Sequence, residues 1–151
     1  MADYRIPFPD DDYLAAIGRM TYAIGYLEWS ILGDLPQIDG LPEALTVEKL
    51  AGKTVADIGK TLQSNLDGVE DSETRAWLKM AADYLLSFSN RRNAVLHGRP
   101  ATTDDGEPQL SRWTKKPGEQ YFITPKLLED LVSDIDLAVT DLSSKRVLKL
   151  G

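Results

Sequence analysis

The chain has 151 residues, 42% of them hydrophobic and 27% charged, which is enough to bury one core without disulfides or metals. It has no cysteine, so disulfides and thiolate metal sites are excluded. A net charge of −7 argues against a general nucleic-acid coat protein, whose surface would be basic. We expect a single domain over residues 1–151. Because no apolar run approaches the roughly 18 residues of a membrane span and the N-terminus does not resemble a signal peptide, we expect a cytoplasmic protein that contacts no membrane.

The N-terminal segment leads into a long helix. Residues 1–12 are expected to form an extended arm, because Pro7 and Pro9 fix the backbone and lack an N–H donor. The acidic run Asp10–Asp12 should cap the helix that follows. That helix is predicted over residues 13–35, where isoleucines recur every seven residues and mark a core stripe, at Ile17, Ile24 and Ile31.

Other residues of this first helix also follow a seven-residue spacing. Two glycines share one track and two aromatic residues share another, at Gly18, Gly25, Tyr22 and Trp29. The glycines either permit close approach by another helix or are chance glycines on a stable helix. Glu28 is the one carboxylate in this apolar stretch. It either faces solvent or serves as the partner of a buried arginine, for which Arg92 is the candidate.

Two more helices are predicted before residue 97. A loop over residues 34–45 is followed by a helix from Thr46 to about Asn65, with a break expected near Gly52. After a loop over residues 66–70, a long helix starts with Asp71 or Ser72 as its cap. Its buried face is marked by apolar residues three and four apart, at Leu78, Ala81, Leu85, Phe88 and Val95.

Three polar residues lie near the end of this helix: Arg92, Asn93 and His97. Arg92 projects within about 20° of Leu85, on the buried face, where an unpaired guanidinium is costly. Either a carboxylate meets it or the face opens there into a site. Asn93 and His97 are four residues apart and share a flank, whereas Arg92 and His97 diverge by about 140°. As the single histidine, His97 is the expected place for proton transfer near neutral pH.

A small β-hairpin and a last helix are predicted to follow. Gly98 fits the left-handed position that ends a helix, and Pro100 prevents its resumption. Residues 101–123 are expected to form a loop and a hairpin, with strands at 109–113 and 119–123. Aromatic residues of the hairpin are expected to pack on the helices rather than to stack on bases: Trp113, Tyr121 and Phe122. Thr124 and Pro125 then open a helix with an apolar stripe.

The pattern Arg92-Asn93-x-x-x-His97 resembles the signature of the HEPN superfamily, in which an arginine and a polar residue precede a histidine near the end of a long helix. The resemblance implies an all-α protein that dimerises through the helix carrying these residues. Together with the predicted elements, it gives a four-helix up-and-down bundle with a small β-hairpin between this helix and the last one. Many proteins that resemble this pattern are metal-independent endoribonucleases of toxin or phage-defence systems.

On the mechanism that the resemblance implies, His97 assists attack of a ribose 2′-hydroxyl on the adjacent phosphate as general acid or base, leaving a 2′,3′-cyclic phosphate. Arg92 stabilises charge on the phosphate, and Asn93 holds the pair in register. No metal site and no cofactor are expected, because the chain has one histidine and scattered carboxylates. Local positive charge that could contact RNA comes from a group of basic residues, Arg91, Arg99, Arg112, Lys115 and Lys116.

Two alternatives stay open at this point. In one, Arg92 forms a structural salt bridge and His97 only interacts with the helix C-terminus. In the other, which the acidic charge favours, the chain is a non-catalytic HEPN-like dimeric module that binds a protein or nucleotide. HEPN toxins silenced by nucleotidylation carry a tyrosine two residues after the histidine, and Arg99 stands there. A nucleotidyltransferase antitoxin is therefore not expected, whereas another antitoxin or regulatory protein is.

Overall fold

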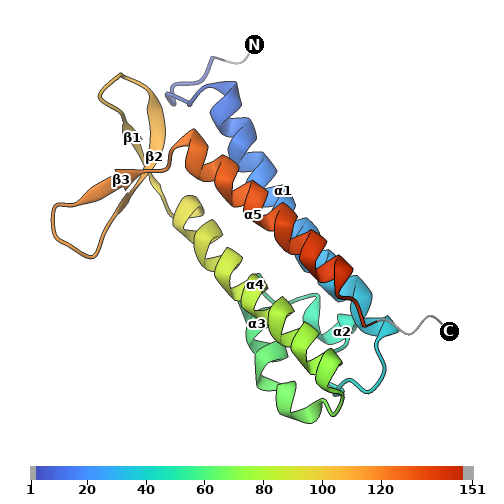
Figure 1. Cartoon of the computed structure of the whole chain (residues 1–151). Coiled ribbons are helices and arrows are strands. Elements are labelled where there is room, and N and C mark those ends of the chain that lie inside the picture. The colour runs from blue at the N-terminus through green and yellow to red at the C-terminus, as the bar shows by residue number, and fades with distance from the viewer. Residues whose placement is uncertain (1–2, 148–151) are drawn as a thin grey trace.

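The computed structural model describes residues 3–147, which form a mostly helical structure with five α-helices and a three-stranded antiparallel sheet (Figure 1). The helices are α1 (Asp11–Asp34), α2 (Val47–Leu50), α3 (Val55–Ser64), α4 (Ser72–Leu96) and α5 (Pro125–Ser144). The strands are β1 (Arg99–Thr102), β2 (Pro108–Trp113) and β3 (Gln120–Phe122). The prediction of a mainly helical protein is confirmed. Within residues 3–147, every helix is too short or too polar to cross a membrane.

Side-chain caps set where the long helices begin. Asp10 accepts a hydrogen bond from the Tyr13 amide at 2.8 Å, and Asp71 accepts one from the Thr74 amide at 2.8 Å. Thr124 caps α5 in the same way. Because Asp10 is the cap, α1 begins at Asp11, and the expected extended arm ends two residues earlier than predicted. The predicted break near Gly52 is confirmed, since residues 51–54 separate α2 from α3.

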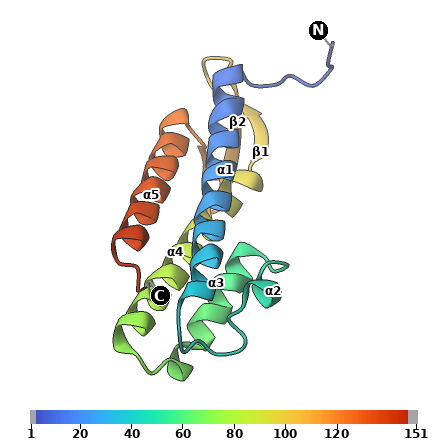
Figure 2. The same ribbon diagram turned by 90° about the vertical axis from the view of Figure 1, so that its right-hand side faces the viewer.

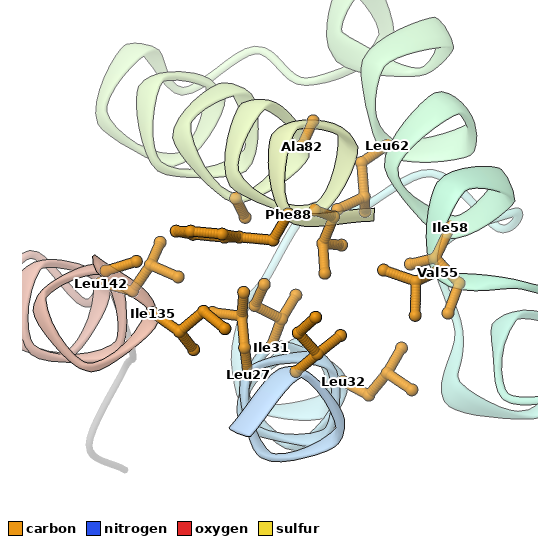
Figure 3. Close-up of a cluster of buried hydrophobic side chains, with 14 of the residues drawn as sticks. Leu27, Ile31, Leu32, Val55, Ile58, Leu62, Ala82, Phe88, Ile135 and Leu142 are labelled. Carbon is orange, nitrogen blue, oxygen red and sulfur yellow. The ribbon is translucent and has the colours of Figure 1, made fainter. Parts of the chain in front are cut away.

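All five helices contribute to one hydrophobic core. Side chains from α1, α3, α4 and α5 point toward one another in Figure 3, among them Leu27, Ile58, Phe88 and Ile135. α1 and α5 run away from the sheet, and α4 runs back toward it (Figure 1). The indole N–H of Trp77 in α4 donates to the carbonyl of residue 142 in α5 at 3.0 Å. These contacts hold α4 so that its C-terminal end meets the sheet.

The sheet contains one strand more than the expected hairpin. β1 pairs with β2, for example Arg99 with Ser111, and β2 pairs with β3, for example Arg112 with Tyr121. The predicted hairpin is confirmed as the antiparallel pair β2 and β3, and β1 is an additional strand that was not predicted. β1 is short and contains Pro100, which an edge strand tolerates because one side of it needs no ladder hydrogen bonds. Glycines with positive φ occupy both turns, Gly106 at +83° and Gly118 at +78°.

A buried tyrosine fastens the sheet to α1. The Tyr13 hydroxyl donates to the carbonyl of Ile123 at 2.7 Å and accepts from the amide of Leu110 at 2.9 Å. Ile123 is buried beside it. Trp113 and Tyr121 take no such role, because they remain 49% and 41% exposed. The prediction that these two aromatic side chains pack on the helices is therefore wrong.

Candidate functional site

The end of α4 is closed by backbone contacts and by a lack of space. The His97 amide donates to the carbonyl of Asn93 at 2.9 Å, and the Gly98 amide donates to that of Val95 at 2.9 Å. Gly98 is not among the glycines with positive φ, so its predicted left-handed conformation is wrong. Glycine is required for another reason. A Cβ at this position would lie 2.9 Å from the Val95 carbonyl oxygen and 3.0 Å from Leu110 Cβ, so a side chain here would push the sheet away from the end of α4.

Arg92 is half-buried on the last turns of α4, as its position on the apolar face predicts. Its Nη2 donates to the side-chain oxygen of Asn93 at 3.3 Å, a long hydrogen bond. Its Nε is buried and has no hydrogen-bond partner within residues 3–147. A guanidinium has five N–H donors in a planar fork. Most of the donor capacity of Arg92 is therefore unused by the residues that the structure describes.

Glu28 on α1 is a carboxylate that lies close enough to Arg92 for an electrostatic interaction. Partial burial raises the pKa of the Glu28 carboxyl above its ordinary value, and the positive charge of Arg92 acts in the opposite direction. Within the described part of the chain, however, no ion pair of 4 Å or less joins the two side chains. Glu28 thus interacts electrostatically with Arg92 but does not accept a hydrogen bond from it.

The adjacent arginine points elsewhere. Arg91 forms an ion pair with Asp134 of α5 at 2.8 Å, and its guanidinium lies 5.6 Å from the ring centroid of Phe88. Arg91 therefore joins α4 to α5, and Arg92 is directed toward α1. Of the two neighbouring arginines, Arg91 is paired with a carboxylate, whereas no ion pair to Arg92 is present among the described residues.

His97 is exposed at the junction of α4 with the sheet. Nη1 of Arg112 in β2 donates to the backbone carbonyl of His97 at 3.2 Å, which fixes a guanidinium beside it. Arg99 in β1 lies with its guanidinium 5.8 Å from the ring centroid of Trp113, an arrangement typical of a cation–π contact. The structure thus gathers three basic or titratable residues and one exposed aromatic ring at this end of the molecule.

The remaining predicted basic residues lie in the next turn. Lys115 and Lys116 are exposed in the β2–β3 turn that follows Trp113. The stacking of Arg99 on Trp113 was not predicted. The contact can be inferred only once the pairing of β1 with β2 is known. Arg99 lies opposite Ser111, and Trp113, two residues further along β2, is its diagonal neighbour.

Arg92 and His97 remain separate within one chain. Among the described residues no hydrogen bond links their side chains, in keeping with their divergence of about 140° around a regular helix. A hollow of about 550 Å³ lies between the N-terminal ends of α1 and α5, and its lining does not include either residue. Residues 3–147 contain no group of three or more His, Asp or Glu side chains placed to hold a metal ion.

Comparisons with protein-family models, with curated proteins and with solved structures find no match to this chain.

Proposed function

We propose that this protein is a metal-independent endoribonuclease of HEPN type, built as an up-and-down helical bundle and acting as a homodimer with a composite site. Arg92, Asn93 and His97 form the catalytic group. RNA is the substrate, and a role in a toxin or defence system with an antitoxin or other regulatory protein is part of the proposal. The sequence pattern suggests this reading, and the geometry at the end of α4 supports it.

The observation that carries the proposal is the state of Arg92. Its guanidinium is half-buried, its Nε lacks a partner among the described residues, and its one hydrogen bond is a long one to Asn93. An arginine retained only as a salt bridge would have its donors satisfied by a carboxylate. Unused donors on a planar fork suit a phosphate, which offers two oxygens in matching geometry. Asn93 contributes by holding the fork in place.

His97 supplies the proton-transfer group. As general base it removes the proton of a ribose 2′-hydroxyl while that oxygen attacks the adjacent phosphorus. The bond from phosphorus to the 5′-oxygen then breaks, and that oxygen takes up a proton from an acid. The products are a 2′,3′-cyclic phosphate and a 5′-hydroxyl. The imidazolium of His97 formed in the first step can supply the proton that the 5′-oxygen takes up, so each site needs one His97.

The basic residues around His97 are suited to the RNA backbone. Arg99 and Arg112 lie at the junction, and Lys115 and Lys116 extend the positive charge along the turn. The exposed ring of Trp113 offers a face on which an unpaired base can stack. Arg91 contributes less positive charge to this surface, because it already forms an ion pair with Asp134.

A second candidate is a dimeric HEPN-like module that binds a protein or nucleotide without cleaving it. The net charge of −7 favours this function, since repulsion weakens binding of a polyanion away from the local basic surface. In such a module Arg92 would bind an anionic group of the partner without a chemical step.

Cleavage in the presence of EDTA separates the two candidates. Purified wild-type chain is incubated with single-stranded RNA, and the ends are analysed for 2′,3′-cyclic phosphate. We expect cleavage by the wild type and losses of about 10² or more for Arg92→Ala and for His97→Ala. Arg92→Lys, which keeps the charge but loses the fork, should retain only part of the activity. Arg5→Ala, an exposed arginine in the N-terminal arm, is the control and should cleave normally. Equal cleavage by His97→Ala, or a strict need for a divalent ion, would contradict the proposal.

A further inference from the structure

One side of α1 is left uncovered by the rest of the chain. Its core residues face α3, α4 and α5, and on the opposite side six residues spaced three or four apart form one line, Leu14, Gly18, Tyr22, Gly25, Trp29 and Gly33. We call this line the α1 stripe. In Figure 2, α1 lies in the foreground between α5 and α3, with no other element in front of it.

The large side chains of the α1 stripe are strongly exposed. Tyr22 is 78% exposed, Trp29 55% and Leu14 39%, and Tyr26 at the edge of the stripe is 58% exposed. The three aromatic rings together present about 400 Å² of surface to solvent. A contiguous apolar patch of this size on a monomer commonly marks an interaction site. By contrast, Leu96 is the only large apolar residue that α4 leaves exposed.

The glycines of the α1 stripe are not required by any close contact among the described residues. A Cβ added at Gly18, Gly25 or Gly33 meets no atom within 4 Å. Elsewhere a helical glycine is explained by a neighbour, as at Gly59, where a Cβ would lie 3.0 Å from Leu86 Cγ. Glycine is the poorest helix former after proline, so three on one exposed face weaken α1 without an internal gain. A second helix that approaches closely would make use of them.

We propose that the α1 stripe is the contact surface for a second copy of this chain, packed antiparallel about a two-fold axis level with residues 23 and 24. The order of large and small residues in the stripe is self-complementary about that point. In this register every large side chain lies level with a glycine of the other copy: Leu14 with Gly33, Tyr22 with Gly25, and Trp29 with Gly18. Parallel packing would instead place large residues against each other and glycines against each other, which leaves clashes and gaps.

The flanks of α1 fit the same arrangement. A two-fold axis perpendicular to antiparallel helices brings equivalent flanks together. Arg19 and Tyr26 lie on one flank, so Arg19 of each copy comes beside Tyr26 of the other, where a cation–π contact forms. A stable dimer buries about 800 Å² per partner. The aromatic rings supply about half of this area, and Leu14, Arg19 and the exposed helix backbone add to it.

Both copies of Arg92 then lie on one side of the dimer. Glu28, the neighbour of Arg92, occupies the other flank of α1, and the two-fold axis places both copies of that flank together. The two Glu28 residues are offset by about 13 Å along the helix axis. α1 thus supplies the contact area in place of α4, the helix through which the HEPN resemblance implies dimerisation, and the end of α4 borders it. The dimer does not depend on the proposed function, because a binding module could form it equally well.

Measurement of the molar mass by light scattering over a dilution series tests the interface. The full chain should be a dimer at tens of micromolar. Tyr22→Asp and Trp29→Asp should each raise the dissociation constant by about tenfold or more, because a charge is then buried in an apolar contact. Leu137→Asp is the matched control, since Leu137 on α5 is 67% exposed and lies outside the stripe, and it should remain a dimer. A monomeric wild type, or a dimer that persists in the Tyr22→Asp/Trp29→Asp double variant, would overturn the proposal.

Disulfide cross-linking tests the antiparallel register, since the chain has no cysteine of its own. Tyr22→Cys places two thiols next to the axis, with Cα atoms about 6–7 Å apart, within reach of a disulfide. Leu14→Cys places them about 28 Å apart along the axis. We expect oxidised dimers from Tyr22→Cys only. Equal cross-linking of both variants would indicate parallel helices and refute the register. Neither readout uses RNA. Loss of the interface in a chain that still dimerises would contradict this inference alone, whereas a monomeric wild type would contradict both the interface and the composite ribonuclease site.

Discussion

Removing the charges of Arg92 and Glu28 together distinguishes an arginine kept for chemistry from one kept for the fold. The double variant Arg92→Met/Glu28→Gln retains the side-chain volumes. The buried Nε of Arg92 has no acceptor among the described residues, and an unsatisfied buried donor costs about 1–3 kcal/mol. Since Met has no donor to leave unsatisfied, we expect the unfolding free energy to rise by about 1–2 kcal/mol while RNA cleavage is lost.

Urea denaturation followed by circular dichroism at pH 7 measures this change. Each kcal/mol should also raise the Tm by roughly 2–4 °C. The single variant Arg92→Met should be less stable than the double variant, because it leaves the Glu28 carboxylate without its nearby positive charge. Removing the exposed ion pair next to it, with Arg91→Met/Asp134→Asn, is the control and should cost less than about 1 kcal/mol. A loss of about 2 kcal/mol or more in the Arg92→Met/Glu28→Gln variant would refute the reasoning and make Arg92 structural.

Three further predictions concern the surroundings of the site. Burial raises the pKa of the Glu28 carboxyl in the folded chain. As the pH rises, Glu28 therefore loses its proton in the unfolded chain before it does so in the folded chain. The unfolding free energy falls with pH between the ordinary pKa near 4.5 and the raised pKa. Glu28→Gln should flatten this part of the pH–stability curve measured by urea denaturation, and an unchanged slope would exclude Glu28 as its source. Gly98→Ala, whose Cβ would meet the Val95 carbonyl at 2.9 Å, should lower the unfolding free energy by about 1–3 kcal/mol, whereas a neutral effect would show that the junction is not tightly packed. Tyr13→Phe leaves two backbone groups of the sheet attachment unpaired and should cost about 1–3 kcal/mol by the same assay, with a cost near zero counting against the attachment.

Local signals in the sequence were sufficient for most of the helical structure. Thr124 was predicted as a cap and Asp71 as one of two candidates with Ser72, because short polar side chains before an apolar period commonly cap helices; Thr124 and Asp71 both accept the expected hydrogen bonds. The break near Gly52 followed from helix propensity in the same way. These features depend on neighbours within about four residues along the chain, which is the range over which a sequence pattern carries information.

Features that depend on distant partners were not predictable from the pattern. Strand β1 is polar and contains Pro100, so its pairing with β2 rests on the turn at Gly106 and on the docked position of the sheet. Gly98 was correctly identified as a special position, but the reason is the approach of Leu110 from β2 and not a left-handed backbone. The attachment of the sheet to α1 through the Tyr13 hydroxyl likewise joins residues about 100 positions apart in the sequence.

The same limit applies to the candidate site. The 3.6-residue period correctly placed Arg92 on a partly buried face, and it indicated that His97 lies on another. It could not reveal that Glu28 approaches without pairing, nor that Arg112 is held at the His97 carbonyl. In α1, the seven-residue spacing correctly marked Ile24 and Ile31 as buried, but because apolar residues occur on all sides it could not show that Trp29 is exposed.

Subunit mixing tests the composite ribonuclease site most directly. Arg92→Ala and His97→Ala chains are each confirmed as folded dimers, mixed under conditions that allow exchange, and assayed on RNA in EDTA. If each site takes its arginine from one subunit and its histidine from the other, heterodimers contain one intact site. Half of the dimers are then mixed, and activity should recover to about a quarter of the wild-type value. No recovery in a mixture with demonstrated heterodimers would contradict the composite site.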